Sequence, residues 1–167
     1  MPDKHQVMKR SRELKPLSSE HHQALLVAFQ LKQGLAGHPD SAGAPKDLPG
    51  LLQLARRFEE QVFRTHTRAE EDLLVRIVPE RDLARLRSEH AEMTRLLELA
   101  RTARPGDLRA HLSSFADLLE RHVRWEEREL FTYAEGHMDE ETLARIGGEL
   151  EKRLVLAHGE TKSARRP

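Results

Sequence analysis

The chain contains no cysteine. That absence excludes disulfide bonds, iron–sulfur ligation by cysteine and thiol catalysis. There is also no excess of either charge, because 28 lysines and arginines balance 28 aspartates and glutamates. A general binder of nucleic acid or of an anionic membrane needs a basic excess, so neither is an expected partner.

Long apolar runs are absent as well. No segment approaches the length of a membrane span, and the opening MPDKHQVMKR has no apolar core after its charges, so it does not resemble a signal peptide. We therefore expect a cytoplasmic protein that does not enter a membrane.

Charged residues make up 34% of the 167-residue chain, and they are interleaved with leucine, alanine and valine in helical periodicity. Such arrays indicate amphipathic helices rather than disorder. No strand-like alternation is present, and the length suits one domain with its own core. The sequence therefore predicts an all-α fold.

Proline, glycine and capping residues divide the chain into segments. We expect a flexible N-terminal arm over residues 1–16, a four-helix bundle over 17–136, a C-terminal helix over 137–160 and a disordered tail over 161–167. The bundle helices are expected to begin at Ser18 or Ser19, at Asp47, at Glu80 and at Asp107. Short connections favour an up-down-up-down bundle, with the additional C-terminal helix outside it and interrupted at Gly147 and Gly148.

Two segments share the pattern HxxxE: HTRAE at 66–70 and HVRWE at 122–126. Residues four apart lie on one face of a helix, and here that face is the apolar one. Glu71 and Glu127, which follow the two motifs, are rotated off this face and are predicted to be solvent-side charges. A glutamate in a bundle core is costly unless it is paired or bound to a metal. The core-facing candidates are His66, Glu70, His122 and Glu126.

The first and third helices offer further histidines. His22 has apolar residues three, four and seven positions later, so it heads an apolar stripe and is the preferred candidate in the first helix. The apolar centre of the whole helix leaves His21 as the alternative. The third helix contributes His90.

The expected helix ends allow a test of whether these side chains reach one level. With a rise of about 1.5 Å per residue, His66 and His90 differ in height by about 3 Å, as do His90 and His122. His22 and His66 differ by about 6 Å. An antiparallel bundle would therefore bring all six groups close together in its interior.

Four imidazoles and two carboxylates suit a centre of two metal ions. If both glutamates and one oxygen from solvent bridge the ions, each ion has two nitrogen and three oxygen ligands, which leaves room for a small molecule. Mixed imidazole and carboxylate ligands suit iron, manganese or zinc. Glutamate and histidine at helical spacing in a bundle core are a recurrent di-iron arrangement.

In this order, histidine, HxxxE, histidine, HxxxE, the chain resembles the hemerythrin-like family, the HHE cation-binding domain, over roughly residues 14–136. The resemblance implies a non-haem di-iron centre, bridged by an oxo or hydroxo group, that binds dioxygen, peroxide or nitric oxide. By the same resemblance the terminal ligands are His22 (or His21), His66, His90 and His122, and the bridging ligands are Glu70 and Glu126.

Two positions differ from the oxygen-carrying hemerythrins. Thr94 stands where those proteins have a second histidine in the third helix, and Glu127 stands where they have an aspartate. One histidine fewer leaves the irons more open, which favours redox chemistry, sensing, detoxification or iron handling over oxygen carriage. Whether the protein is an enzyme stays open.

A second hypothesis has no redox role. The same residues would then hold zinc or another divalent metal in a structural or regulatory helical bundle. In either case the C-terminal helix offers a surface through which a homo-oligomer can form.

Overall fold

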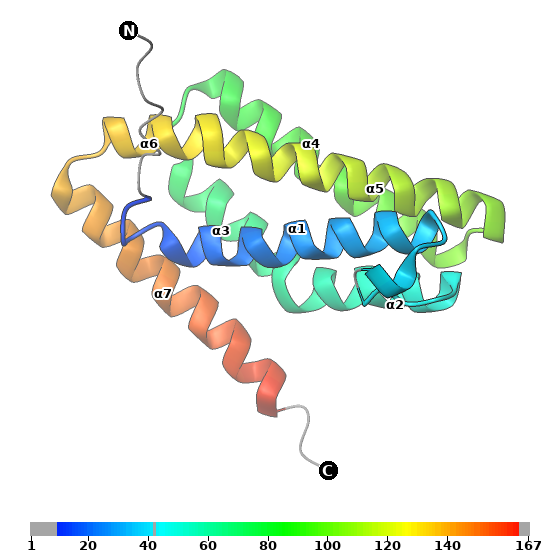
Figure 1. The fold of residues 1–167 in the computed structure, drawn as a ribbon. Helices are drawn as coiled ribbons and strands as arrows, with labels where there is room; N and C mark the ends of the chain where they lie inside the picture. The colour runs from blue at the N-terminus through cyan, green and yellow to red at the C-terminus, as the bar shows by residue number, and fades with distance from the viewer. Residues whose placement is uncertain (1–9, 42, 164–167) are drawn as a thin grey trace, which may run out of the picture.

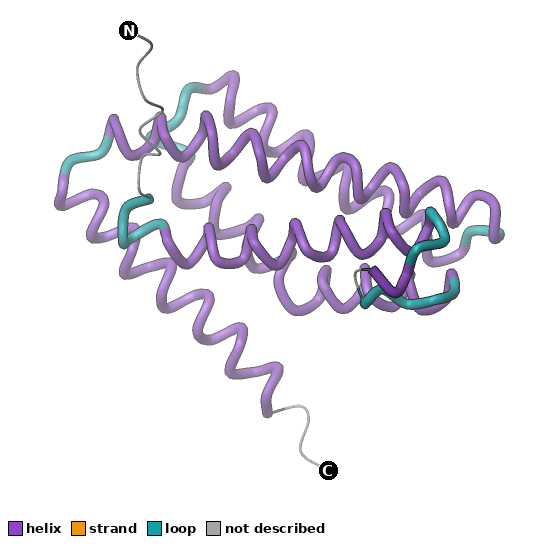
Figure 2. Tube along the Cα trace, in the orientation of Figure 1, coloured by secondary structure: helices purple, strands orange, loops and turns teal. Residues whose placement is uncertain are grey.

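Helices account for most of the chain in the computed structural model, in which residues 10–41 and 43–163 are described, with side chains for 10–40 and 43–154. Figure 2 shows these helices joined by short connections, and no strand occurs in the described ranges. The elements are α1 Lys15–Leu35, η1 Pro39–Ser41, α2 Leu48–Phe58, η2 Glu59–Phe63, α3 Arg64–Leu74, α4 Glu80–Thr102, α5 Pro105–Trp125, η3 Glu126–Leu130, α6 Phe131–His137 and α7 Glu140–Ser163. The expected all-α class is confirmed.

Several elements run on without interruption, so the described chain forms a few long rods. One rod consists of α2, η2 and α3, and another of α5, η3 and α6. Together with α1 and α4 they lie side by side as a helical bundle (Figure 1). α5 packs against both α1 and α4, α2 packs against α1, and α3 packs against α4.

Two apolar clusters fill the bundle at different levels. One joins the second half of α1 to α2, the end of α4 and the start of α5, around residues such as Leu31, Met93 and Phe115. The other lies towards the opposite end, around residues such as Leu17, Leu86 and Phe131. Burial of these side chains is the main stabilising contribution, at roughly 25 cal/mol per Å² of apolar surface.

The N-terminal segment does not match the expected loose arm over the part that is described. Leu14 is fully buried, and the side chain of Arg10 lies 2.7 Å from Glu135 and 3.0 Å from Glu127. α1 begins at Lys15, with Pro16 in its first turn, and no serine caps it. Residues 1–9 lie outside the described residues.

The helix starts show one correct and one wrong expectation. Asp47 caps α2 as predicted, because its carboxylate accepts a hydrogen bond of 2.8 Å from the Gly50 amide. α5 begins at Pro105, two residues before the predicted cap Asp107, because proline suits a first helical turn in which its missing N–H costs nothing.

Each of the two composite rods contains one π-helical turn, η2 and η3. In η2 the buried Glu59 faces Arg64 at 2.9 Å and Arg101 of α4 at 3.3 Å, which ties this turn to the neighbouring rod. π turns inside α-helices are frequently found at functional sites. Both turns lie next to an HxxxE motif.

The C-terminal helix α7 crosses the outside of the bundle (Figure 1) and contacts α3, α1 and η2. Ile146 and Leu150 are buried against the bundle. The expected interruption at Gly147 and Gly148 is wrong, because α7 is continuous. A side chain at Gly147 would lie 2.8 Å from the Glu13 side chain, so glycine there permits close packing.

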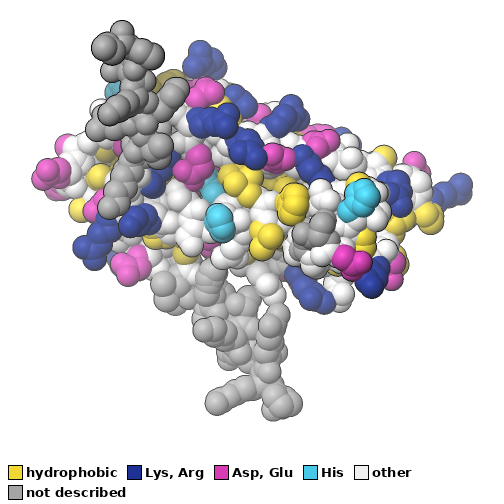
Figure 3. All heavy atoms as spheres, viewed as in Figure 1, with side chains coloured by type: hydrophobic (Ala, Val, Ile, Leu, Met, Phe, Trp, Pro, Cys, Tyr) yellow, Lys and Arg dark blue, Asp and Glu magenta, His cyan; other side chains and the backbone are white. Residues whose placement is uncertain are grey.

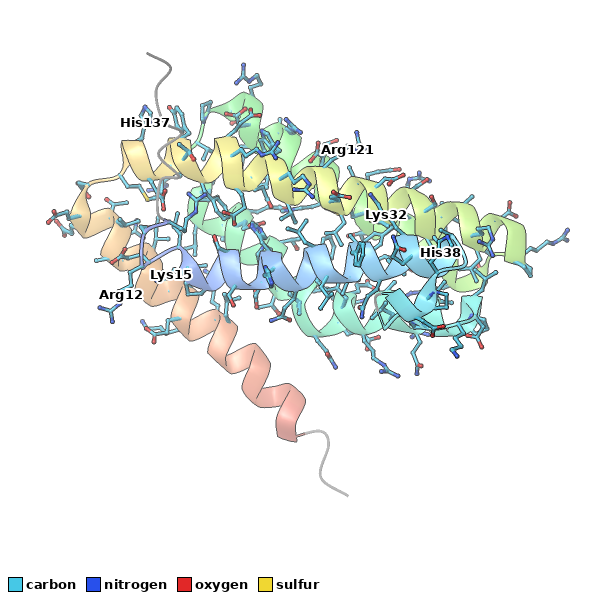
Figure 4. The ribbon with its side chains drawn as sticks, in the orientation of Figure 1. Arg12, Lys15, Lys32, His38, Arg121 and His137 are labelled. Atoms are coloured by element: carbon cyan, nitrogen blue, oxygen red, sulfur yellow. The ribbon has the colours of Figure 1, made fainter. Side chains whose placement is uncertain are left out.

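The outer surface carries both charges. Basic and acidic side chains are interspersed on the face in Figure 3. Lys32 of α1, which is labelled in Figure 4, pairs with Asp117 of α5 at 2.9 Å. Two large apolar side chains of α1, Leu26 and Phe29, are about half exposed, at 52% and 47%. Over the described range, every helix is too short or too polar to cross a membrane.

Candidate metal centre

Six ionisable side chains meet between the two apolar clusters of the bundle. They form two groups that share both glutamates: His21, His66, Glu70 and Glu126 in one, and His90, His122, Glu70 and Glu126 in the other. Within each group the donor atoms lie within 4.8 Å of one another. Along its own helix, each histidine has residues of one apolar cluster on one side and residues of the other cluster on the other side. The six polar side chains therefore form a layer between the two clusters.

The histidines face each other in pairs through the same ring nitrogen. The Nε2 atoms of His21 and His66 are 3.0 Å apart, and those of His90 and His122 are also 3.0 Å apart. We name these the His21–His66 half and the His90–His122 half. A ligand position with two converging imidazole nitrogens is typical of a bound divalent transition metal.

The two shared glutamates divide their oxygens between the halves. Oε1 of Glu70 lies 2.9 Å from Nε2 of His66, and Oε2 lies 3.4 Å from Nε2 of His90. Oε2 of Glu126 lies 3.0 Å from Nε2 of His21, and Oε1 lies 2.9 Å from Nε2 of His122. Each carboxylate thus offers one oxygen to each half, as a bridging ligand does.

Neither glutamate has the surroundings of an ordinary buried carboxylate. Both Glu70 and Glu126 are 0% exposed, and all four of their side-chain oxygens are buried without a hydrogen bond of acceptable geometry. No lysine or arginine within the described ranges pairs with either of them. Buried charges of this kind are costly unless a counter-charge satisfies them, and a metal ion supplies one. The donor set therefore fits a metal ion.

A second layer of carboxylates lies behind the histidines. The Nδ1 atom of each ring is 2.7 Å from a glutamate oxygen of another element. The four pairs are Glu20 with His66, Glu71 with His90, Glu89 with His122 and Glu127 with His21. We call these four glutamates the outer carboxylates. A carboxylate that accepts the Nδ1 proton leaves the Nε2 lone pair facing the centre.

The prediction that Glu71 and Glu127 are plain solvent-side charges is therefore wrong. Both are partly buried, and each holds a histidine of a neighbouring rod. Glu20 and Glu89 were not candidates at all, yet they do the same. The signal in the sequence is that Glu20 and Glu89 immediately precede His21 and His90. One position along a helix is a rotation of about 100°, enough to aim the glutamate at the next rod.

The preference for His22 is also wrong. His22 is exposed, whereas His21 is 2% exposed and faces the cluster. The ring of Phe131 stacks on His21 at 5.2 Å between centroids, which helps to hold its orientation. The other candidates, His66, Glu70, His90, His122 and Glu126, lie together in the same layer.

The electrostatics of the cluster favour positive charge at the histidines. Burial disfavours the charged imidazole, but Glu70 and Glu20 outweigh it and raise the pKa of His66 to about 9. In the same way, burial opposes the charge on His122, yet Glu126 and Glu89 raise its pKa to about 10. Protons on these rings take the role of the counter-charge that a metal would otherwise supply.

The carboxylates shift in the opposite direction. Burial alone would raise the pKa of Glu70, but His66 and His21 hold it well below its ordinary value. Burial likewise opposes ionisation of Glu127, while His21 and Ser18 lower its pKa to about 2. Glu70 and Glu127 are therefore anionic at neutral pH, as a metal ligand and the partner of a ligand need to be.

A cavity of about 10 Å³ adjoins the cluster on the side of the first apolar cluster. Its walls include histidines and Glu126 on one side and apolar side chains on the other, among them Phe58, Val62, Phe63, Leu119 and Val123. A space of this size holds about one water-sized molecule. A ligand bound there would touch the donor atoms at one end and hydrocarbon at the other.

Comparison of the chain with models of known families, with curated proteins and with solved structures gives no match. The function is therefore inferred from the donor atoms and their surroundings. Taken together, the described residues define an all-helical bundle with buried histidine and glutamate groups that can hold a metal ion.

Proposed function

We propose that this protein is a non-haem di-iron protein of hemerythrin type, with an up-down-up-down four-helix bundle around the metal centre. His21 and His66 would bind one iron, and His90 and His122 the other. Glu70 and Glu126 would bridge the two ions. The observation that carries the proposal is the division of each buried carboxylate between two pairs of imidazole nitrogens.

The substrate class follows from the cavity. It is small, it adjoins the donor atoms, and its remaining walls are mostly apolar, with Glu20 and Thr67 as the polar exceptions. A space for about one water-sized molecule is consistent with a small ligand such as dioxygen, nitric oxide or peroxide. When bound, two ferrous ions supply two electrons to such a molecule.

The residues around the centre have separable tasks. The four histidines and two glutamates hold the ions, while the outer carboxylates keep each imidazole in one tautomer and orientation. Apolar side chains such as Phe63 and Leu119 exclude bulk water from the cavity. Exclusion of water strengthens the electrostatic interactions at the centre and slows side reactions.

A zinc-bound structural or regulatory bundle is the second candidate. The observation that favours it is that each half has two nitrogen and two oxygen donors, a four-ligand set to which the described residues add no further ligand. Closed four-coordinate sites are typical of structural zinc.

Metal content separates the two candidates. Protein expressed in iron-replete cells would be analysed by mass spectrometry for bound metals, and the same sample by absorption spectroscopy. About two irons per chain, with near-ultraviolet bands that change on reduction, would support the di-iron proposal. Stoichiometric zinc that ferrous iron fails to replace under anaerobic conditions would refute it in favour of the second candidate.

A further inference from the structure

The outer carboxylates connect the rods of the bundle in a closed cycle. α1 holds a histidine of α3 through Glu20, and α3 holds a histidine of α4 through Glu71. α4 then holds a histidine of α5 through Glu89, and η3 holds the histidine of α1 through Glu127. Every rod therefore contributes one inner histidine and one outer carboxylate, and the carboxylate always serves a different rod.

The outer carboxylates divide into two pairs, one pair for each half of the centre. Glu70 and Glu126 are shared, so any change in either of them affects both halves. The outer carboxylates are not shared. Glu20 and Glu127 bond the Nδ1 atoms of the His21–His66 half, and Glu71 and Glu89 bond those of the His90–His122 half.

We propose that the outer carboxylates are positioning residues that set the metal affinity of the two halves independently. Glu20 and Glu127 act on the ion at the His21–His66 half, and Glu71 and Glu89 act on the ion at the other half. The proposal rests on the proposed metal centre. Its physical basis is that an anionic acceptor at Nδ1 fixes the imidazole tautomer, orients the ring and increases the basicity of Nε2.

Two of the outer carboxylates, Glu127 and Glu89, are themselves held by side chains outside the centre, so their positions do not depend on a metal. Glu127 accepts a hydrogen bond of 2.7 Å from the Ser18 hydroxyl and pairs with Arg10 at 3.0 Å. Glu89 pairs with Arg85 at 2.9 Å. This arrangement holds the rings in place before an ion arrives, which lowers the cost of ordering them on binding.

The four positions differ in how easily water can replace the carboxylate. Glu20 is 5% exposed, whereas the side chain of Glu71 is 31% exposed and its nearest arginine, Arg87, lies 3.9 Å away. Water can accept the Nδ1 proton at an exposed position but not at a buried one. The loss on substitution is therefore largest at Glu20 and smallest at Glu71.

Single substitutions to glutamine test the proposal, because glutamine keeps the shape and an acceptor oxygen but removes the charge. Each Glu→Gln variant of the four would be titrated as apoprotein with cobalt(II), against a competing chelator. We expect one of two cobalt ions to bind about 10- to 100-fold more weakly and the other to be unchanged. Glu92→Gln is the matched control, because Glu92 of α4 pairs only with Arg95 on the surface.

Nitrogen NMR of the histidine rings in zinc-loaded protein identifies which half is affected. In Glu71→Gln or Glu89→Gln the signals of His90 and His122 should change, and those of His21 and His66 should not. If these glutamates served only to stabilise the fold, their substitution would not change the histidine signals of one half alone. Leucine at the same position should lose more affinity than glutamine, because leucine removes the acceptor as well.

The outcomes separate the two proposals. Wild-type protein that takes up no divalent metal refutes the metal centre itself. Wild-type protein that binds two ions, together with outer-carboxylate variants that bind both with unchanged affinity, overturns only the positioning role. Equal weakening of both ions in every variant also overturns it. If Glu20→Gln does not fold, the partly exposed Glu71 and Glu89 still decide the question.

Discussion

Replacement of His122 by alanine should halve the metal content. His122 belongs to one of the two donor groups and is absent from the other. Its removal leaves three protein donors in the His90–His122 half and all four in the His21–His66 half. The expected result is a fall from about two ions per chain to about one.

The size of the effect follows from the contacts of His122. Its Nε2 lies 2.9 Å from Glu126 and 3.0 Å from the Nε2 of His90, so His122 contacts two of the three other donors in its half. Loss of an outer partner weakens metal binding by about 10- to 100-fold, and loss of the ligand itself should cost at least the upper value. A factor of 100 corresponds to about 2.8 kcal/mol.

The fold should survive this change. Glu126 keeps a contact of 3.0 Å with His21, so its buried charge is not left without a partner. Mass spectrometry gives the metal content, and circular dichroism reports the helicity. His111→Ala is the control, because His111 lies on the same helix, is only partly buried and belongs to neither donor group. Two tightly bound ions in the helical His122→Ala variant would refute the assignment of this half.

Three further predictions concern stability. Because the folded pKa values of His66 and His122, about 9 and about 10, exceed the ordinary value of about 6.5, their contribution is complete below pH 6.5 and is lost as the pH rises towards 10. Melting temperatures should therefore fall over that range in apoprotein but much less in metal-loaded protein; parallel curves would contradict this. Gly147→Ala should destabilise by about 1–3 kcal/mol in urea unfolding through its contact with Glu13, whereas Gly148→Ala, which meets no atom, should stabilise by roughly 0.5–1 kcal/mol. Arg10→Ala should lower stability by about 1–3 kcal/mol, because Arg10 and its partner Glu135 are mostly buried and Arg10 also donates to the Glu127 carbonyl; unchanged stability in the same unfolding assay would contradict this role.

Local features of the chain are well predicted from the sequence. The spacing of four between His66 and Glu70, and between His122 and Glu126, places each pair on one face of a helix wherever the helix packs. The structure brings these four residues together with His90, as the comparison of heights along the helices indicates. Such inferences succeed because helix geometry depends on a few neighbouring residues.

The choice between His21 and His22 could not be made in this way. The apolar residues that follow His22 suggest a buried stripe, yet Leu26 and Phe29 are about half exposed. Adjacent residues of a helix differ by about 100° in direction, and an amphipathic face has no sharp edge. The neighbouring rods decide which of the two points inward.

The sequence by itself determined the helices, the absence of thiol chemistry and the paired HxxxE motifs, because each depends on composition or on spacing along one helix. Only the tertiary structure decided that His21 joins the centre and that four outer carboxylates hold the histidines. Glu20 and Glu127 lie far along the chain from the rings that they contact. Contacts of this kind depend on the register and rotation of whole rods, which result from core packing summed over many residues.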